Sequence, residues 1–174
     1  MATVLTTTYS GASATTITMD LSALAASSTF VAGRESSQID NTSNKYIDAI
    51  VYGWVIVGTT PTLPCSFNVY VWGNDVSLAT TAIDVLDGTD SAETLTNTTV
   101  LNSALQLART SSILVNTSDT KYVVKPFSVA KALQLDVLPP FWGLYCSHNM
   151  TAALKTDAGN TNAFRFHGIT YTST

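Results

Sequence analysis

Charged side chains are scarce in this sequence, where Asp, Glu, Lys and Arg make up 11% of the 174 residues. An ordinary soluble domain carries about 25%. Intrinsic disorder needs high charge and low hydrophobicity, so a chain with 45% hydrophobic residues is expected to fold. Only eight residues are Lys or Arg, they form no basic stripe, and the net charge is −4. This composition argues against nucleic acid and against an anionic membrane surface as partners.

Long apolar segments are missing too. The beginning of the chain, MATVLTTTYS, has neither the basic nor the apolar region of a signal peptide, and no apolar run approaches the roughly 18 residues of a membrane span. We therefore expect a protein that is made and kept in a cytoplasm, or assembled there. The sequence has only two cysteines, Cys65 and Cys146, and both lie beside aromatic, strand-like segments. We expect free, buried thiols rather than a disulfide.

Helical periodicity is nearly absent. Instead, β-branched and aromatic runs are separated by clusters of Gly, Pro, Asn, Asp and Ser, a pattern typical of strands and turns. Segment 101–108 could be a short helix before a strand. The expected strands are 3–9, 15–20, 45–57, 66–73, 112–115, 121–129, 141–148 and 162–172. This pattern predicts an all-β fold: an antiparallel β-sandwich, jelly-roll-like if the long loops are crossovers, with an extended N-terminal arm.

Segment 45–57 gives the strongest strand signal because both of its alternating faces are apolar. Such a strand is expected to be covered on both sides, by a second sheet and by another element or subunit. Segment 66–73 is expected to pair back against it after a turn, and Pro126 is expected at a sheet edge or bulge. We place an arm and long loop at 1–44 and the sandwich core at 45–174, within a single domain.

Motifs for catalysis are absent from the sequence. It contains no GxSxG elbow, no GxGxxG and no Walker-type loop, so hydrolase and nucleotide-binding chemistry are not indicated. The two histidines, His148 and His167, lie in expected strands without metal-ligand spacing, and a metal role stays open only if those strands are neighbours. We expect a protein that is not an enzyme and uses no cofactor.

An acidic loop is the strongest candidate for a metal site. Asp84, Asp87, Asp90 and Glu93 recur every three residues around Gly88, and calcium sites draw oxygen ligands from flexible loops. The spacing does not match an EF-hand. Asp-Gly and Asp-Ser also form turns through local hydrogen bonds, and we favour this interpretation. The four acidic residues are therefore kept only as calcium candidates.

Three tryptophans, Trp54, Trp72 and Trp142, could form a platform that stacks on sugars. Aromatic residues that alternate within strands are more often part of a core or a subunit interface, and we favour that reading.

Arg34 and Glu35 interrupt a nearly uncharged region and could form either a local ion pair or a contact with a partner. We take Arg34, Glu35, Tyr52 and Trp54 as interface candidates.

Three segments resemble virion structural proteins of tailed bacteriophages. They are LAASSTFVAGRESSQIDNTSNKYIDAIVYGWVIVGTTPT, DVLDGTDSAETLTNTTVLN and VLPPFWGLYCSHNMTAAL, so the resemblance spans roughly residues 20–155. It implies a small structural component of the particle with a jelly-roll-like sandwich, similar to capsid decoration (cement) proteins. Such proteins carry no catalytic motif and commonly sit as dimers or trimers over contacts between major capsid proteins.

The expected function that follows is a decoration protein on the capsid exterior of a virion, assembled in the host cytoplasm. Its expected partners are the major capsid protein, whose lattice it would bind and stabilise, and further copies of itself, as a homotrimer in preference to a homodimer. The alternative is a receptor- or carbohydrate-binding module of a phage tail fibre or baseplate. The low charge, the two-sided apolar strand and the Thr-rich N-terminus suit a protein that packs against neighbours.

Overall fold

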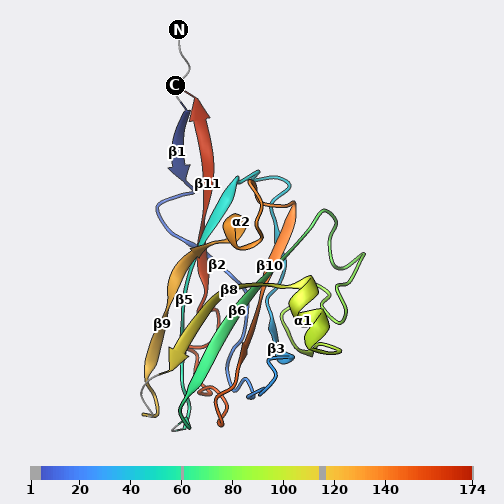
Figure 1. The fold of residues 1–174 in the computed structure, drawn as a ribbon. Helices are drawn as coiled ribbons and strands as arrows, with labels where there is room; N and C mark the ends of the chain where they lie inside the picture. The colour runs from blue at the N-terminus through green and yellow to red at the C-terminus, as the bar shows by residue number, and fades with distance from the viewer. Residues whose placement is uncertain (1–4, 60, 114–116, 174) are drawn as a thin grey trace.

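Most of the expected strand segments form strands in the computed structural model, which describes residues 5–59, 61–113 and 117–173. Two antiparallel sheets pack face to face (Figure 1). The first, called here the β5 sheet, contains β1 (Leu5–Tyr9), β2 (Thr15–Thr16), β5 (Asp48–Ile56), β9 (Lys121–Ser128) and β11 (Arg165–Ser173). The second, the β6 sheet, contains β3 (Ala32–Glu35), β4 (Ile39–Asp40), β6 (Cys65–Asn74), β7 (Ser91–Thr94), β8 (Gln106–Ile113) and β10 (Phe141–His148).

The strand order is that of a jelly roll. The β5 sheet runs β1-β11-β5-β9, with β2 also paired to β11, and the β6 sheet runs β7-β3-β10-β6-β8, with β4 also paired to β10. We count β1 and β2 together as strand 1, count β3 and β4 together as strand 2, and leave β7 out. The remaining strands β5, β6, β8, β9, β10 and β11 are then numbers 3 to 8, and the two sheets have the orders 1-8-3-6 and 2-7-4-5. Two interlocked Greek keys give this arrangement. The predicted antiparallel, jelly-roll-like sandwich is therefore confirmed.

The main core lies between the two sheets. One face of β5 supplies Val51 and Val55, and β6 supplies Phe67 and Val69, all fully buried. The ring of Phe67 stacks on that of Phe164, with centroids 6.4 Å apart. Burial of these β-branched and aromatic faces is the main force that holds the sheets together.

A second core covers the outer face of the β6 sheet. Trp72 from β6 and Tyr145 from β10 point away from the first core and are fully buried. The long connection after β6, which includes β7 and the helix α1 (Thr98–Ala104), packs on them. It contributes five buried leucines: Leu78, Leu86, Leu95, Leu101 and Leu105. Strands β6 and β10 are therefore buried on both faces, as their near-continuous apolar sequences require.

Strand β5 is covered by its own chain on one face only. Ala49, Val51 and Val55 are fully buried, whereas Tyr52, on the other face, is 37% exposed. The predicted pairing of 66–73 with 45–57 is wrong, because β6 pairs with β8 and β10 in the opposite sheet. The connection between β5 and β6 crosses from one sheet to the other instead of closing a hairpin.

The region between β7 and α2 was partly predicted from the sequence. A short helix does precede a strand here, but α1 ends at Ala104 and β8 begins at Gln106, earlier than the expected start at 112; residues 3, 4, 114 and 115 lie outside the described residues. Strand β9 is at the edge of its sheet, and its register with β5 shifts next to Pro126, as predicted. A second helix, α2 (Val129–Ala132), follows directly.

Residues on the N-terminal side of the predicted boundary at 44/45 take part in both sheets. Strand β2 pairs with β11, and β3 and β4 pair with β10. Ile17, Met19 and Leu21 are fully buried in the main core. Strand β1 instead pairs with the end of β11 as a two-stranded ribbon that projects beyond the sandwich (Figure 1).

No helix among the described residues has the length and apolar character needed to cross a membrane.

Candidate protein-binding surface

The outward side of the β5 sheet has no second layer of the described chain packed over it comparable to the one on the β6 sheet. Cross-strand neighbours place Arg165 beside Tyr52 and Val123 beside Trp54 on this side. Strand residues that alternate with the buried ones make up the surface, which we call the outer face. It consists of Tyr9, Ile50, Tyr52, Trp54, Ile56, Lys121, Val123, Lys125, Arg165, His167 and Tyr171.

Aromatic rings form a connected row on the outer face. The His167 ring lies between Tyr52 and Tyr9, with edge-to-face contacts at centroid distances of 5.9 and 6.0 Å. Tyr9 is 58% exposed. Beside this row, Val123 is 70% exposed, an unusual exposure for a β-branched residue within a strand. Large, rigid, exposed rings next to exposed aliphatic side chains are typical of protein-binding surfaces.

Trp54 lies half-buried on the outer face, and its indole N–H donates a hydrogen bond to the Gly159 carbonyl at 2.8 Å. The Lys121 ammonium is 3.9 Å from the ring centroid, a cation–π contact that covers the ring. The other two tryptophans of the possible sugar platform, Trp72 and Trp142, are fully buried. The structure therefore does not bring the three rings together on a surface.

The exposed charged side chains on the outward side of the β5 sheet are basic, whereas Asp48, which alternates with the buried residues of β5 and lies on the same side, is half-buried. Lys121, Lys125 and Arg165 are exposed, and none belongs to an ion pair among the described residues. The nearest carboxylate on this side of β5, that of Asp48, accepts hydrogen bonds from the Ala49 and Ala130 amides. Although the whole chain is acidic, this surface is positively charged.

The carboxylates of the candidate calcium loop each bond to a different partner. Asp84 accepts hydrogen bonds from the amide and hydroxyl of Thr96, both at 2.7 Å, and these bonds lower its pKa. Asp87 accepts from the Thr89 amide at 2.8 Å, a turn-forming contact. Among the described residues, no group of three or more His, Cys, Asp or Glu side chains could hold a metal ion. Asp87 thus forms a turn, whereas Asp84 and Asp90 bond to residues elsewhere in the chain.

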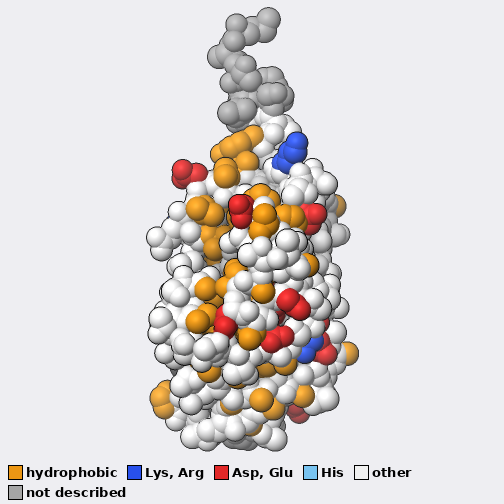
Figure 2. Space-filling model, turned by 90° about the vertical axis from the view of Figure 1, so that its right-hand side faces the viewer, with side chains coloured by type: hydrophobic (Ala, Val, Ile, Leu, Met, Phe, Trp, Pro, Cys, Tyr) orange, Lys and Arg blue, Asp and Glu red, His pale blue; other side chains and the backbone are white. Residues whose placement is uncertain are grey.

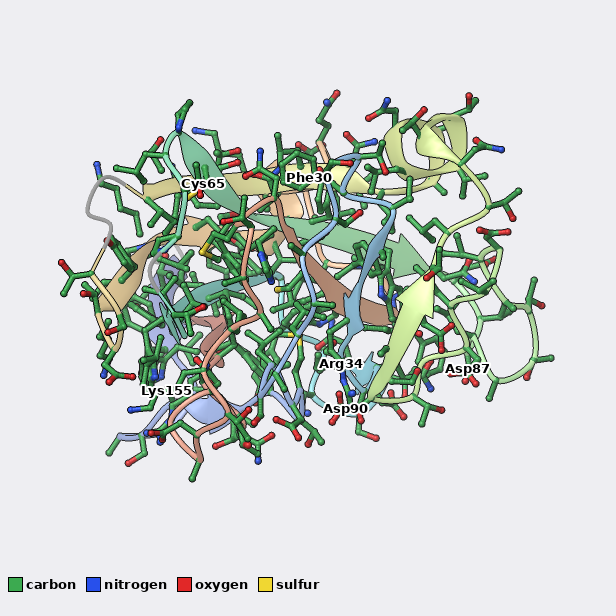
Figure 3. The ribbon with its side chains drawn as sticks, turned by 90° about the horizontal axis from the view of Figure 1, so that it is seen from below. Phe30, Arg34, Cys65, Asp87, Asp90 and Lys155 are labelled. Carbon is green, nitrogen blue, oxygen red and sulfur yellow. The ribbon has the colours of Figure 1, made fainter. Side chains whose placement is uncertain are left out.

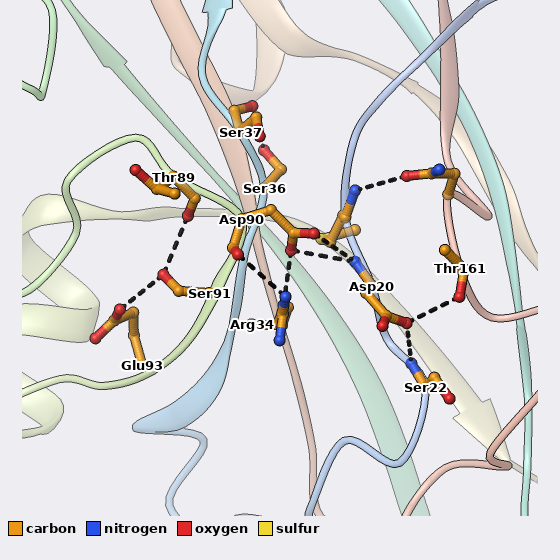
Figure 4. A network of polar contacts seen from close by, with 12 residues as sticks. Asp20, Ser22, Arg34, Ser36, Ser37, Thr89, Asp90, Ser91, Glu93 and Thr161 are labelled. Atoms are coloured by element: carbon orange, nitrogen blue, oxygen red, sulfur yellow. Dashed lines mark hydrogen bonds and ion pairs between the residues drawn. The ribbon is translucent and has the colours of Figure 1, made fainter.

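Arg34 and Asp90 form an ion pair at 2.7 Å, with a second hydrogen bond from Arg34 to the Asp90 carbonyl at 3.1 Å (Figure 4). Asp90 also accepts from the Asp20 amide, and the Asp20 carboxylate accepts from the Thr161 hydroxyl. Arg34 thus forms an ion pair within its own chain, with the distant Asp90 and not with the adjacent Glu35. The network fastens the acidic loop to β3 and to two other segments.

Glu35, also an interface candidate, is fully buried beneath the acidic loop. Its carboxylate accepts hydrogen bonds from the amides of Asp87 at 3.1 Å and Gly88 at 3.0 Å. Gly88 has a φ of +82°, which a residue with a side chain would adopt only with strain. Burial raises the pKa of Glu35 to about 7, although the two amide hydrogen bonds oppose this shift. Glu35 therefore anchors the loop and does not itself face a partner.

The two histidines lie in different sheets, and the two cysteines are not bonded to each other. His148 is buried in β10, where its Nε2 is 2.9 Å from the Leu24 carbonyl oxygen and burial lowers its pKa. His167 lies in the other sheet, within the aromatic row. Cys65 and Cys146 are unpaired and buried, so the prediction of free thiols is confirmed.

Sequence reasoning identified Tyr52 and Trp54 but missed the rest of the outer face. Lys121, Val123 and Lys125 alternate with the buried Val124, and this period of two was the available signal. Which strands would lie beside β5, and hence which side chains would join its surface, depended on the sheet order.

No protein-family model, no curated protein and no solved structure matches this chain.

Proposed function

We propose that this protein is a virion structural protein of the capsid decoration class, which binds the lattice of a major capsid protein and stabilises it. The proposal rests on the resemblance of three segments to phage virion proteins, together with the physical properties of the chain. Binding to the assembled lattice would stabilise the particle by mass action, without chemistry.

The observation that carries the proposal is the terminal ribbon. It pairs Leu5–Tyr9 with residues 169–173 and projects from the jelly roll (Figure 1). A two-stranded ribbon is at best marginally stable alone in water. Thr6, Thr7 and Thr8 are exposed, and Tyr171 is 57% exposed, so the described chain does not cover it. Such an arm gains stability when it lies against another protein.

A hollow at the foot of the ribbon offers further contact area. It has a volume of about 590 Å³ and includes Thr7, Ile47, Leu135, Ile169 and Tyr171 in its lining. Leu135 is 48% exposed. The lining also includes the charged residues Asp48, Lys131 and Asp136, so the hollow combines exposed apolar side chains with a few charges of both signs, as protein contact surfaces do.

The alternative, a carbohydrate-binding module of a tail fibre or baseplate, receives less support. It requires accessible tryptophans, and Trp72 and Trp142 are fully buried, while Lys121 covers Trp54. We therefore place the capsid proposal first.

The test is co-sedimentation with expanded capsids of the phage that encodes the chain, prepared without this protein. We expect the protein to sediment with the capsids and to raise their melting temperature. A protein that stays in the supernatant and leaves the capsid melting temperature unchanged contradicts the proposal.

Two variants locate the contact. Y9S/Y171S removes the exposed rings of the ribbon and should weaken capsid binding by at least about tenfold, because buried aromatic anchors carry much of the energy of an interface. Leu107 in β8 is 53% exposed and far from the ribbon, so L107S is the matched control and should bind like the wild type. Equal binding by both variants would exclude the ribbon as the contact.

A further inference from the structure

The outer face needs a partner whose charge is opposite to its own. It carries three basic side chains, Lys121, Lys125 and Arg165, without ion pairs among the described residues. Two copies of this chain stacked outer face to outer face would bring these like charges together, which is unfavourable. A symmetric face-to-face dimer is therefore disfavoured, and the occupant must be acidic.

The same chain presents a surface of the required chemistry. In segment 75–87, which follows β6, the exposed acids Asp75, Asp84 and Asp87 alternate with Val76 and Val85, which are 41% and 38% exposed. Figure 2 shows that acidic side chains gather on this side of the molecule, where basic ones are few. Acids beside exposed valines complement basic residues beside exposed aromatic rings and Val123.

The acidic segment is held in place before any partner binds. Gln38 donates to the Ser77 hydroxyl at 2.7 Å and accepts from the Leu78 amide at 3.1 Å. The buried Glu35 accepts from the amides of Asp87 and Gly88 at the end of the segment. A segment that is already ordered loses little conformational entropy on binding, which favours its use as a contact.

The two surfaces lie on opposite sides of one molecule. In Figure 1, β9 lies at one side of the sandwich and the connection after β6, with α1, at the other. Seen from below, Asp87 is toward one side, and Lys155, which pairs with Asp119 just before β9, is toward the other (Figure 3). The acidic segment of a copy therefore cannot cover the outer face of the same copy.

We propose that the part of the outer face formed by β5 and β9, away from the ribbon rings Tyr9 and Tyr171, binds the 75–87 segment of a second copy of this chain, head to tail. A heterologous contact of this kind forms a closed ring when the rotation between copies closes, and an open filament when it does not. A ring of three matches the homotrimer expected from the sequence. The contact requires no capsid, so it can be tested separately from the proposed function.

The experiment is a charge swap measured by analytical ultracentrifugation at low salt. The wild type should form a discrete oligomer. K121E/K125E reverses the charge of the outer face, and D75K/D87K reverses that of the segment; each alone should raise the concentration of half-dissociation by at least about tenfold. Mixing the two variants should restore the oligomer, because each altered surface then meets its opposite. High salt should weaken the wild-type oligomer.

Controls separate this contact from general effects of charge. K45E reverses the charge of an exposed lysine outside both surfaces and should leave the oligomer intact, whereas the matched single change K121E should weaken it. D75N/D87N keeps the shape of the loop acids and should weaken association less than D75K/D87K. A monomeric wild type, an oligomer that survives both reversals, or a mixture that stays monomeric would overturn the proposal. A monomer that still sediments with capsids would overturn it without affecting the proposed function.

Discussion

The two sheets of this jelly roll differ in what lies outside them. The β6 sheet carries a second layer made by its own chain, with five leucines packed on Tyr70, Trp72 and Tyr145. The β5 sheet has no such layer among the described residues, and Tyr52, Val123 and Tyr171 remain exposed. Both sheets have apolar side chains on both faces, yet the chain completes only one of them. This difference in coverage is the reason why we propose the outer face of the β5 sheet as a contact surface.

The largest expected effect tests the covered sheet. Trp72→Ala should lower the free energy of unfolding by about 3–5 kcal/mol, because it leaves a cavity in a fully buried cluster. Trp54→Ala, on the outer face, should cost only about 1–2 kcal/mol through the loss of one hydrogen bond and of the cation–π contacts with Lys121 and Arg165. Chemical denaturation of both variants measures the two values. Equal losses would mean that the sheets are equally covered.

Next comes the carboxyl that anchors the covering loop. Burial raises the folded-state pKa of Glu35 from 4.5 to about 7, so the folded state binds this proton more tightly than the unfolded state. The resulting stability is fully present below pH 4.5 and is lost as the pH rises through about 7, by up to about 3 kcal/mol. The wild type should therefore lose stability from pH 5 to pH 8 relative to Glu35→Gln.

Urea denaturation of both proteins across this pH range measures that difference. The buried His148 is present in both, so its own titration cancels. Parallel pH profiles for the two proteins would contradict the assigned anchor and its raised pKa.

A smaller loss of stability is expected when a methyl group is added at a glycine of each sheet, and the two losses compare how tightly the sheets are packed. A Cβ on Gly143 in β10 would come within 2.5 Å of the Trp72 ring, which is enclosed. Gly143→Ala should cost about 1–3 kcal/mol through overpacking. A Cβ on Gly168 in β11 would meet the Tyr46 ring at 2.4 Å, but that ring is only half-buried and can turn away. Thermal unfolding should show a larger loss for Gly143→Ala, and the reverse order would contradict this comparison.

The smallest expected effect on folding lies on the edge strand β9 of the outer face. Val123 is 70% exposed, so Val123→Ser should change the free energy of unfolding by no more than about 0.5 kcal/mol. If a partner covers this face, the same change should weaken association clearly. Denaturation and sedimentation of one sample give both values. A large loss of stability without any change in association would show that the residue serves only folding.

Much of the architecture could be predicted from local patterns. The β-branched and aromatic runs gave the position of β5, β6, β9, β10 and β11, because alternation along a strand is a local property. The partner of each strand could not be predicted in the same way. Segments 45–57 and 66–73 looked like a hairpin, and nothing in their side chains shows that the connection crosses between sheets.

The residues of the candidate surface were likewise predictable only where they depended on a single strand. Tyr52 and Trp54 could be named from the pattern of β5 alone, whereas Arg165 and Lys121 join them only because β11 and β9 flank β5. Arg34 and Glu35 were identified as unusual, but their roles depend on where the acidic loop folds back. The sequence around a carboxylate does not show whether its hydrogen-bond partner will be a backbone amide, an arginine or water.

Composition and strand alternation act residue by residue, and they were sufficient to predict an all-β sandwich with little charge. That the leucines of the 75–105 connection cover the β6 sheet and leave the β5 sheet open follows from how the whole chain packs. The reason is physical. Burial is a property of what packs on a surface, and contacts between residues distant in the chain are set by the whole fold.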